Sequence, residues 1–84
     1  MENDIKDIKE KIERWKIKAE ALKISKNKAF IKDIHDTWYF CEIISWDDAI
    51  LQVRIFKGKR MDMIDDIFWC DIKSLEKYKE ARQW

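Results

Sequence analysis

The spacing of apolar residues changes once along this chain, and that change limits the fold more than any other feature. Over residues 2–27 the apolar side chains recur at steps of three and four, as in a helix, and from Ala29 onward they alternate, as in a strand. A chain of 84 residues suffices for one domain. We therefore predict an α+β protein with a single domain over residues 1–84, in which an amphipathic helix (1–28) precedes a small β-barrel (29–84).

The expected helix carries two apolar rows. The first follows the a and d positions of a heptad over three repeats and comprises Ile5, Ile8, Ile12, Trp15, Ala19 and Leu22. The second row consists of Ile17, Ala21 and Ile24, and a helix that is apolar on two sides needs two partners. One partner can be the sheet. Because the helix would be about 35 Å long, longer than a small barrel is wide, we predict a homo-oligomer that associates through the first row.

Five strands are expected in the second part of the chain, forming an antiparallel, strongly bent sheet or barrel. Their predicted bounds are Ala29–His35, Trp38–Trp46, Ala49–Phe56, Met61–Trp69 and a short fifth at Ser74–Tyr78. The chain has one glycine and no proline, so its turns must be built from Asp, Asn, Ser and Lys. The tail Glu76–Trp84 is compatible with a helix as well as a strand, so the end of the fifth strand stays open.

Two segments resemble the Sm-like and Tudor-like small barrels, which share a Src-homology-3-like fold. They are YFCEIISWDDAILQVRIF (39–56) and FWCDIKSLEKY (68–78), and the likeness extends over about residues 29–78. A helix ahead of the barrel is the Sm-like arrangement in particular. The Asp-x-Asn turn that contacts RNA in that family would fall on Asp47-Asp48-Ala49, which lacks the Asn, and its Arg-Gly-Asp-like segment falls near Cys70-Asp71, which keeps only the Asp. The resemblance therefore does not imply RNA binding through the Sm pocket.

The Tudor-like side of the resemblance rests on the phrase DTWYFCEI, which looks like the second strand of those domains. Tudor-like domains read methylated side chains with an aromatic cage. The resemblance implies that Trp38 and Tyr39 would be walls of such a cage.

The net charge is only +1, but the basic residues are unevenly distributed. From Arg14 to Lys32 there are seven basic residues against one acid, Glu20, and a second basic cluster spans 57–60. Such clusters can contact the phosphates of RNA or single-stranded DNA, and the alternative is a solvated helix face. The candidate nucleic-acid-binding residues are Arg14, Lys16, Lys18, Lys23, Lys26, Lys28, Lys32, Lys57, Lys59 and Arg60.

Five tryptophans suggest both a core and a contact surface. We expect Trp38 and Trp69 in the core, and Trp46 and Trp84 as an exposed pair that could stack on bases or anchor a protein partner. The two cysteines, Cys41 and Cys70, have no metal-binding or redox spacing. They are interpreted as small buried hydrophobic residues in a reducing compartment.

No pattern for catalysis, metal binding or a cofactor is found in the sequence. The one histidine, His35, is expected in a turn, and Asp62, Asp65 and Asp66 lack the spacing of a calcium loop and are interpreted as a solvated acidic strand edge. The N-terminus is charged and no apolar run approaches a membrane span of about 20 residues. We predict a cytoplasmic protein that is not an enzyme: a small-barrel interaction or adaptor protein that self-associates. The alternatives are a nucleic-acid-binding Sm-like protein that uses the basic helix face, and a Tudor-like peptide reader.

Overall fold

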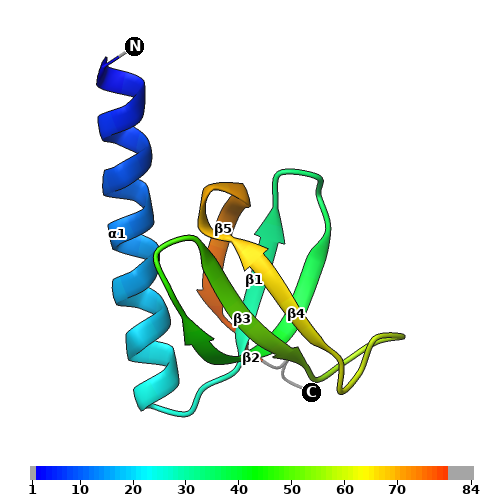
Figure 1. Ribbon diagram of the computed structural model, residues 1–84. Coiled ribbons are helices and arrows are strands. Elements are labelled where there is room, and N and C mark those ends of the chain that lie inside the picture. Colours follow the sequence, from blue (N-terminus) through cyan, green and yellow to red (C-terminus); the bar gives the residue numbers. More distant parts are fainter. Residues whose placement is uncertain (1, 80–84) are drawn as a thin grey trace.

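A computed structural model describes the backbone of residues 2–79 and the side chains of residues 6–79 (Figure 1). One long helix is followed by five antiparallel strands, which confirms the predicted α+β class. The elements are α1 (Glu2–Ile24), β1 (Ala29–Asp33), β2 (Trp38–Trp46), β3 (Ile50–Ile55), β4 (Ile64–Phe68), the 3₁₀ helix η1 (Trp69–Asp71) and β5 (Ile72–Lys77).

The strands form one sheet in the order β4-β3-β2-β1-β5, in which every neighbouring pair is antiparallel. The first four strands form a meander, and η1 then reverses the chain so that β5 returns to pair with β1. The register of β2 against β3 shifts between Ile43 and Ser45, and such an irregularity bends a strand. The sheet is bent but not closed, because β4 and β5 do not pair with each other.

The helix lies along one side of the sheet, and its N-terminal part projects beyond the strands (Figure 1). The first apolar row faces the sheet: Ala19 and Leu22 are buried in the core, and Ile12 and Trp15 pack against it. Burial of a leucine side chain stabilises a fold by roughly 1.5–3 kcal/mol. The predicted first row is thus largely covered by the chain's own sheet.

The second apolar row is on the opposite side of the helix and remains open. Ile17 is 66% exposed and Ile24 is 73% exposed, and Ala21 between them is exposed as well. Two ion pairs connect the helix to the sheet. Lys16 pairs with Asp48 in the β2–β3 turn at 3.1 Å, and Lys18 pairs with Glu76 in β5 at 2.9 Å.

The helix ends earlier than residue 28 because Lys26 adopts a left-handed backbone conformation, with φ 59°. The N–H of Lys26 donates to the carbonyl of Lys23, and the N–H of Asn27 reaches back to the carbonyl of Leu22. This pattern satisfies the last carbonyls of a helix and normally uses glycine. Because a lysine occupies this position, the end of the helix could not be recognised from the residue type.

The core lies between α1 and the inner face of the sheet. Its fully buried residues include Trp69, Ile31, Leu51, Ile72, Leu75, Val53 and Cys41. Trp69 is 1% exposed, as predicted, and its indole Nε1 donates a hydrogen bond of 2.8 Å to the carbonyl of Asp47. Burial raises the pKa of the Cys41 thiol to about 12.

Several predictions about single residues were wrong. Trp38 is 45% exposed and does not belong to the core, and Cys70 is exposed although Cys41 is buried. Trp46, expected to be exposed, is half-buried and packs against the core beside Trp69. Asp65, expected on a solvated edge, has a side chain only 14% exposed.

The observed strand bounds differ from the predicted ones mainly in the fourth and fifth strands. β2 has the predicted limits, but β4 begins at Ile64 because residues 57–63 form a turn with positive φ at Gly58 (102°) and Asp62 (72°). β5 begins at Ile72, and Glu76 and Lys77 are in this strand, so these two positions are not helical. The rest of the tail that was considered for a helix lies mostly outside the described residues.

Candidate functional site

The outer face of the sheet, away from the core, carries a group of aromatic side chains. In β1 the buried residues Ala29 and Ile31 flank Phe30, and in β2 the buried Cys41 follows Phe40. Because side chains alternate between the faces of a strand, Phe30 and Phe40 both point outward. They are paired directly across the two strands, and Trp38 is paired with Lys32 two residues further along.

Five rings make up this group, which we call the aromatic face: Phe30, Trp38, Phe40, Phe56 and Tyr78. Phe30 stacks on Trp38 with ring centroids 4.3 Å apart and planes at 13°, and on Phe40 at 4.8 Å and 21°. Phe56 and Tyr78 meet Phe40 edge to face. Since Phe30 covers one side of the indole, at most the other side of Trp38 is open to a ligand.

Lysine ammonium groups lie over four of these rings. Lys32 Nζ is 4.9 Å from the centre of the Trp38 ring, and Lys28 Nζ is 4.9 Å from that of Phe56. Lys57 Nζ lies 5.3 Å from Phe40 and 5.9 Å from Tyr78. Each contact is an attractive cation–π interaction of about 0.5–1 kcal/mol at an exposed site. The face therefore offers aromatic surface and positive charge together.

The carboxylate of Asp36 partly balances this charge. It lies 3.2 Å from Lys32 Nζ and 3.6 Å from Lys73 Nζ. The hydrogen bond and the charge of Lys32, followed by the charge of Lys73, hold the pKa of Asp36 below its usual range. Asp36 is in the exposed β1–β2 turn, so an incoming anion can compete with it for Lys32.

A hollow of about 250 Å³ lies beside the aromatic face, between the start of β2 and the β3–β4 loop. Trp38, Phe40 and Ile55 line it on the strand side, and the loop residues 57–60 line it on the other. This loop segment contains the predicted basic residues Lys57, Lys59 and Arg60. Arg60 forms an ion pair with Asp65, whose second oxygen is buried without a hydrogen-bond partner among the described residues.

The β1–β2 turn that sets the position of Trp38 is built around one buried carboxylate, Asp33. Its Oδ1 accepts the N–H groups of His35 and Thr37, each at 2.9 Å, and its Oδ2 accepts the hydroxyl of Tyr39 at 3.0 Å. Burial raises the pKa of Asp33, but these three hydrogen bonds outweigh burial and leave the pKa below its ordinary value. Burial, and then the hydrogen bond to Asp33, raise the pKa of Tyr39 to about 12.

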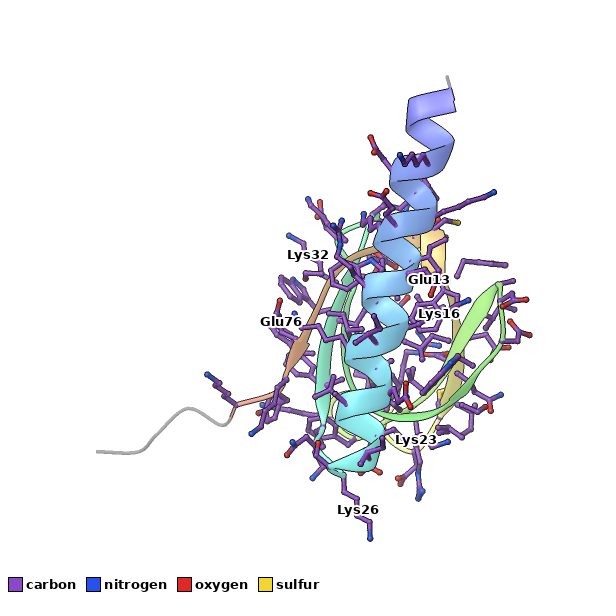
Figure 2. All side chains as sticks on the ribbon, turned by 90° about the vertical axis from the view of Figure 1, so that its left-hand side faces the viewer. Glu13, Lys16, Lys23, Lys26, Lys32 and Glu76 are labelled. Carbon is purple, nitrogen blue, oxygen red and sulfur yellow. The ribbon has the colours of Figure 1, made fainter. Side chains whose placement is uncertain are left out.

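The predicted basic residues are distributed over separate surfaces (Figure 2). Lys28, Lys32 and Lys57 belong to the aromatic face, and Lys59 and Arg60 line the hollow beside it. The helix residues lie elsewhere: Lys16 and Lys18 form ion pairs with the β2–β3 turn and β5, Lys23 lies 5.6 Å over Trp46, and Lys26 and Arg14 are exposed. Figure 2 shows Lys26 directed away from the body at the lower end of the helix, whereas Lys32 lies to the left of α1 and well above that end.

The aromatic cage predicted from Trp38 and Tyr39 stays a prediction. Both residues line the hollow, but Trp38 stacks on Phe30, whereas Tyr39 donates its hydroxyl to the buried Asp33. Of the other predicted aromatic pair, Trp46 packs edge to face on Trp69 at 6.4 Å, and Trp84 lies outside the described residues.

The residues predicted for self-association are mostly occupied by the chain itself. Ile12, Trp15, Ala19 and Leu22 contact the core, whereas Ile8 is 48% exposed. The side chain of Ile5 lies outside the described part. Self-association through this row stays a prediction, and Ile8 is the exposed member of the row among the described side chains.

Four rings of the aromatic face were not among the predicted site residues: Phe30, Phe40, Phe56 and Tyr78. Two of them could have been found from the alternation along their strands, because Phe30 and Phe40 each stand next to residues that are buried. The register that places them side by side, and the return of β5 that brings Tyr78 to them, are not visible in the sequence.

Other kinds of site find little support in the described part of the chain. No group of three or more metal-ligating side chains comes together among these residues, and His35 is exposed in its turn. No helix in the described region has the length and apolar character needed to cross a bilayer. Comparisons with protein-family models, with curated proteins and with solved structures find no match for this chain.

Proposed function

We propose that the protein binds single-stranded nucleic acid through the aromatic face. The observation that supports this most is the placement of three lysines, Lys28, Lys32 and Lys57, over the rings of one continuous aromatic cluster. Proteins that bind single strands combine aromatic surface for the bases with cations for the backbone. RNA and single-stranded DNA share both features, and the proposal covers both.

Trp38 is the ring best placed to receive a base. It is 45% exposed, and Lys32 is the group that lies over it. A base that stacks on the open side of the indole displaces the Lys32 ammonium, whose flexible side chain can then contact the adjoining phosphate. A duplex fits this arrangement less well because its bases are already stacked and paired.

The surroundings of Trp38 disfavour a methylated-lysine ligand. The hollow next to it is lined by Lys57, Lys59 and Arg60, and a second cation in that position would be repelled. Charge complementarity instead favours a phosphate over the methylated side chain of the Tudor-like alternative.

The strand order, with a 3₁₀ turn between β4 and β5 and a helix ahead of β1, supports the Sm-like resemblance as a proposal about ancestry. The proposed binding surface is nevertheless a different one. Asp47, at the turn where the Sm-like RNA contact would fall, uses its Oδ1 to accept the N–H groups of Ala49 and Ile50, both at 2.8 Å. These bonds lower the pKa of Asp47 and make it a turn-forming residue.

The test is fluorescence anisotropy with a labelled single-stranded oligonucleotide, as RNA and as DNA. Trp38→Ala should weaken binding by about 1–3 kcal/mol, the range found for one base stacked on an aromatic ring, which is about 5- to 150-fold. Lys23 over Trp46 is a matched pair outside the aromatic face. Trp46→Ala and Lys23→Glu should therefore leave the affinity nearly unchanged.

The salt dependence gives an independent readout. If Lys28, Lys32 and Lys57 each neutralise one phosphate, the logarithm of the binding constant should fall with the logarithm of salt concentration at a slope of about −2. Lys32→Glu should weaken binding, unlike Lys23→Glu. A slope near zero, or equal losses of affinity for these two variants, would reject the aromatic face as the binding surface.

A second candidate function is self-association, favoured by the open row Ile17, Ala21 and Ile24 on α1. Two isoleucines one heptad apart with a small residue between them form an apolar strip on which a second copy of the helix can pack. Light scattering at tens of micromolar tests this. The wild type should be a dimer or larger and Ile17→Asp a monomer, whereas a monomeric wild type would rule this function out.

A further inference from the structure

The hollow beside the aromatic face has two chemically different walls. On the strand side the lining is mostly aromatic and apolar and comprises Thr37, Trp38, Tyr39, Phe40 and Ile55. On the loop side, residues 57–60 carry three cationic side chains. Its volume of about 250 Å³ is below the range of about 300–1,000 Å³ that holds drug-sized ligands. The hollow therefore fits one small group of a larger ligand, or one small anion.

The backbone of the loop also has N–H groups that the fold does not use. The N–H groups of Met61, Asp62 and Met63 each donate to a loop or strand carbonyl. Those of residues 57–60 donate to no backbone carbonyl within the described part of the chain. Consecutive N–H groups in a loop with a left-handed residue form a concave site for anions, and Gly58 supplies that conformation with φ 102°.

Space is open at this point of the loop. A Cβ built on Gly58 would have no atom within 4 Å. Of the three cations, Arg60 is shared with the carboxylate of Asp65, so Lys57 and Lys59 provide most of the uncompensated charge. Lys57 Nζ also lies over Phe40, which keeps it at the boundary between the aromatic wall and the loop.

From these observations we infer that the hollow is a phosphate subsite, and that one nucleotide is the smallest unit the protein recognises. Its phosphate sits against residues 57–60 and its base lies on the open side of Trp38. This inference rests on the proposed binding of single-stranded nucleic acid and adds where a phosphate is held. It also extends the ligand class to nucleoside 5′-monophosphates.

The experiment uses the chain's one glycine as a reporter. The full-length protein labelled with ¹⁵N-glycine shows the Gly58 amide as a single signal, which is followed by NMR during three separate titrations. The ligands are adenosine 5′-monophosphate, adenosine and inorganic phosphate. We expect the monophosphate to shift this signal with a Kd at least tenfold lower than that of either of the others.

A double variant, Lys57→Gln with Lys59→Gln, should remove this tenfold preference. Lys9→Gln removes one exposed positive charge on α1 and serves as the matched control, which should keep the preference. The circular dichroism spectrum of each variant confirms that the exposed substitutions leave the fold intact.

The outcomes separate this inference from the function on which it rests. If the oligonucleotide binds with a loss for Trp38→Ala but the monophosphate is no tighter than adenosine, the phosphate subsite is refuted and the aromatic face stands. If inorganic phosphate binds as tightly as the monophosphate, the hollow is a plain anion site and the nucleotide unit is refuted. If neither the oligonucleotide nor the monophosphate binds, both proposals fail.

Discussion

Replacing Asp33 with asparagine removes one charge at the centre of the β1–β2 turn and should destabilise the protein by about 2 kcal/mol. Two main-chain N–H groups, of His35 and Thr37, donate to the same carboxylate oxygen at 2.9 Å. A hydrogen bond to a charged group contributes about 1.5–3 kcal/mol and a neutral one about 0.5–1.5 kcal/mol. Each of the two bonds therefore loses about 1 kcal/mol in the variant. At the second oxygen, which accepts the Tyr39 hydroxyl, the asparagine NH2 group donates to that hydroxyl instead, so one neutral hydrogen bond is kept there.

The pH dependence of this difference follows from the pKa of Asp33, which is lowered in the folded protein from 3.8. A lowered pKa contributes stability that is present above pH 3.8 and is lost as the pH falls through the folded-state value. Asp33→Asn cannot titrate. The stability gap between the two proteins should therefore be constant at neutral pH and shrink below about pH 4.

The assay is urea unfolding followed by circular dichroism at pH 7 and at several acidic values. Asp36→Asn is the matched control, because Asp36 is in the same turn but exposed, and it should change stability much less. A gap below about 0.5 kcal/mol at pH 7, within the usual effect of a surface substitution, would refute the account of Asp33. So would a gap that does not change on acidification.

Three further predictions concern the contacts that hold the helix, the core and the turn. Leu22→Ala should lower the free energy of unfolding, measured with urea, by about 2–5 kcal/mol because it leaves a cavity in the core. Ile24→Ala, at a 73% exposed position, should lower it by less than about 0.5 kcal/mol. Trp69→Phe should lower the free energy of unfolding by about 1–3 kcal/mol, because the carbonyl of Asp47 loses the indole N–H that donates to it. A variant as stable as the wild type would contradict this. Tyr39→Phe should be less stable than the wild type at pH 7, and the gap should narrow between pH 10 and about 12, where the raised pKa of Tyr39 makes the wild type lose stability.

The sequence predicted the fold where local spacing determines the structure. β2 was placed from Trp38 to Trp46, as observed, because its apolar run is bounded by Asp-containing turns on both sides. The helix start and the change from a helical to an alternating period were also correct. These features depend only on residues that are close to one another in the sequence.

Predictions failed at two places where the backbone adopts a conformation that its residue type does not favour. Lys26 and Asp62 both have positive φ. The first ends α1 before residue 28, and the second belongs to the turn that delays β4 to Ile64. Glycine would have indicated such positions, but lysine and aspartate do not.

The candidate site was predicted only in part, because it depends on pairing between distant segments. The basic residues Lys28, Lys32 and Lys57 were named from charge alone. Their grouping with Phe30 and Phe40 requires the register of β1 on β2. Trp38 was assigned to the core by its hydrophobicity, although its alternation with Tyr39 was compatible with either face.

The most direct test of the aromatic face is an NMR titration of the tryptophan indole N–H signals with a single-stranded oligonucleotide. Trp38 is half-exposed on that face, whereas the indole of Trp69 is buried and bonded to Asp47. The indole signal of Trp38 should shift most and that of Trp69 should stay in place. Shifts at Trp15 or Trp46 with none at Trp38 would contradict the account.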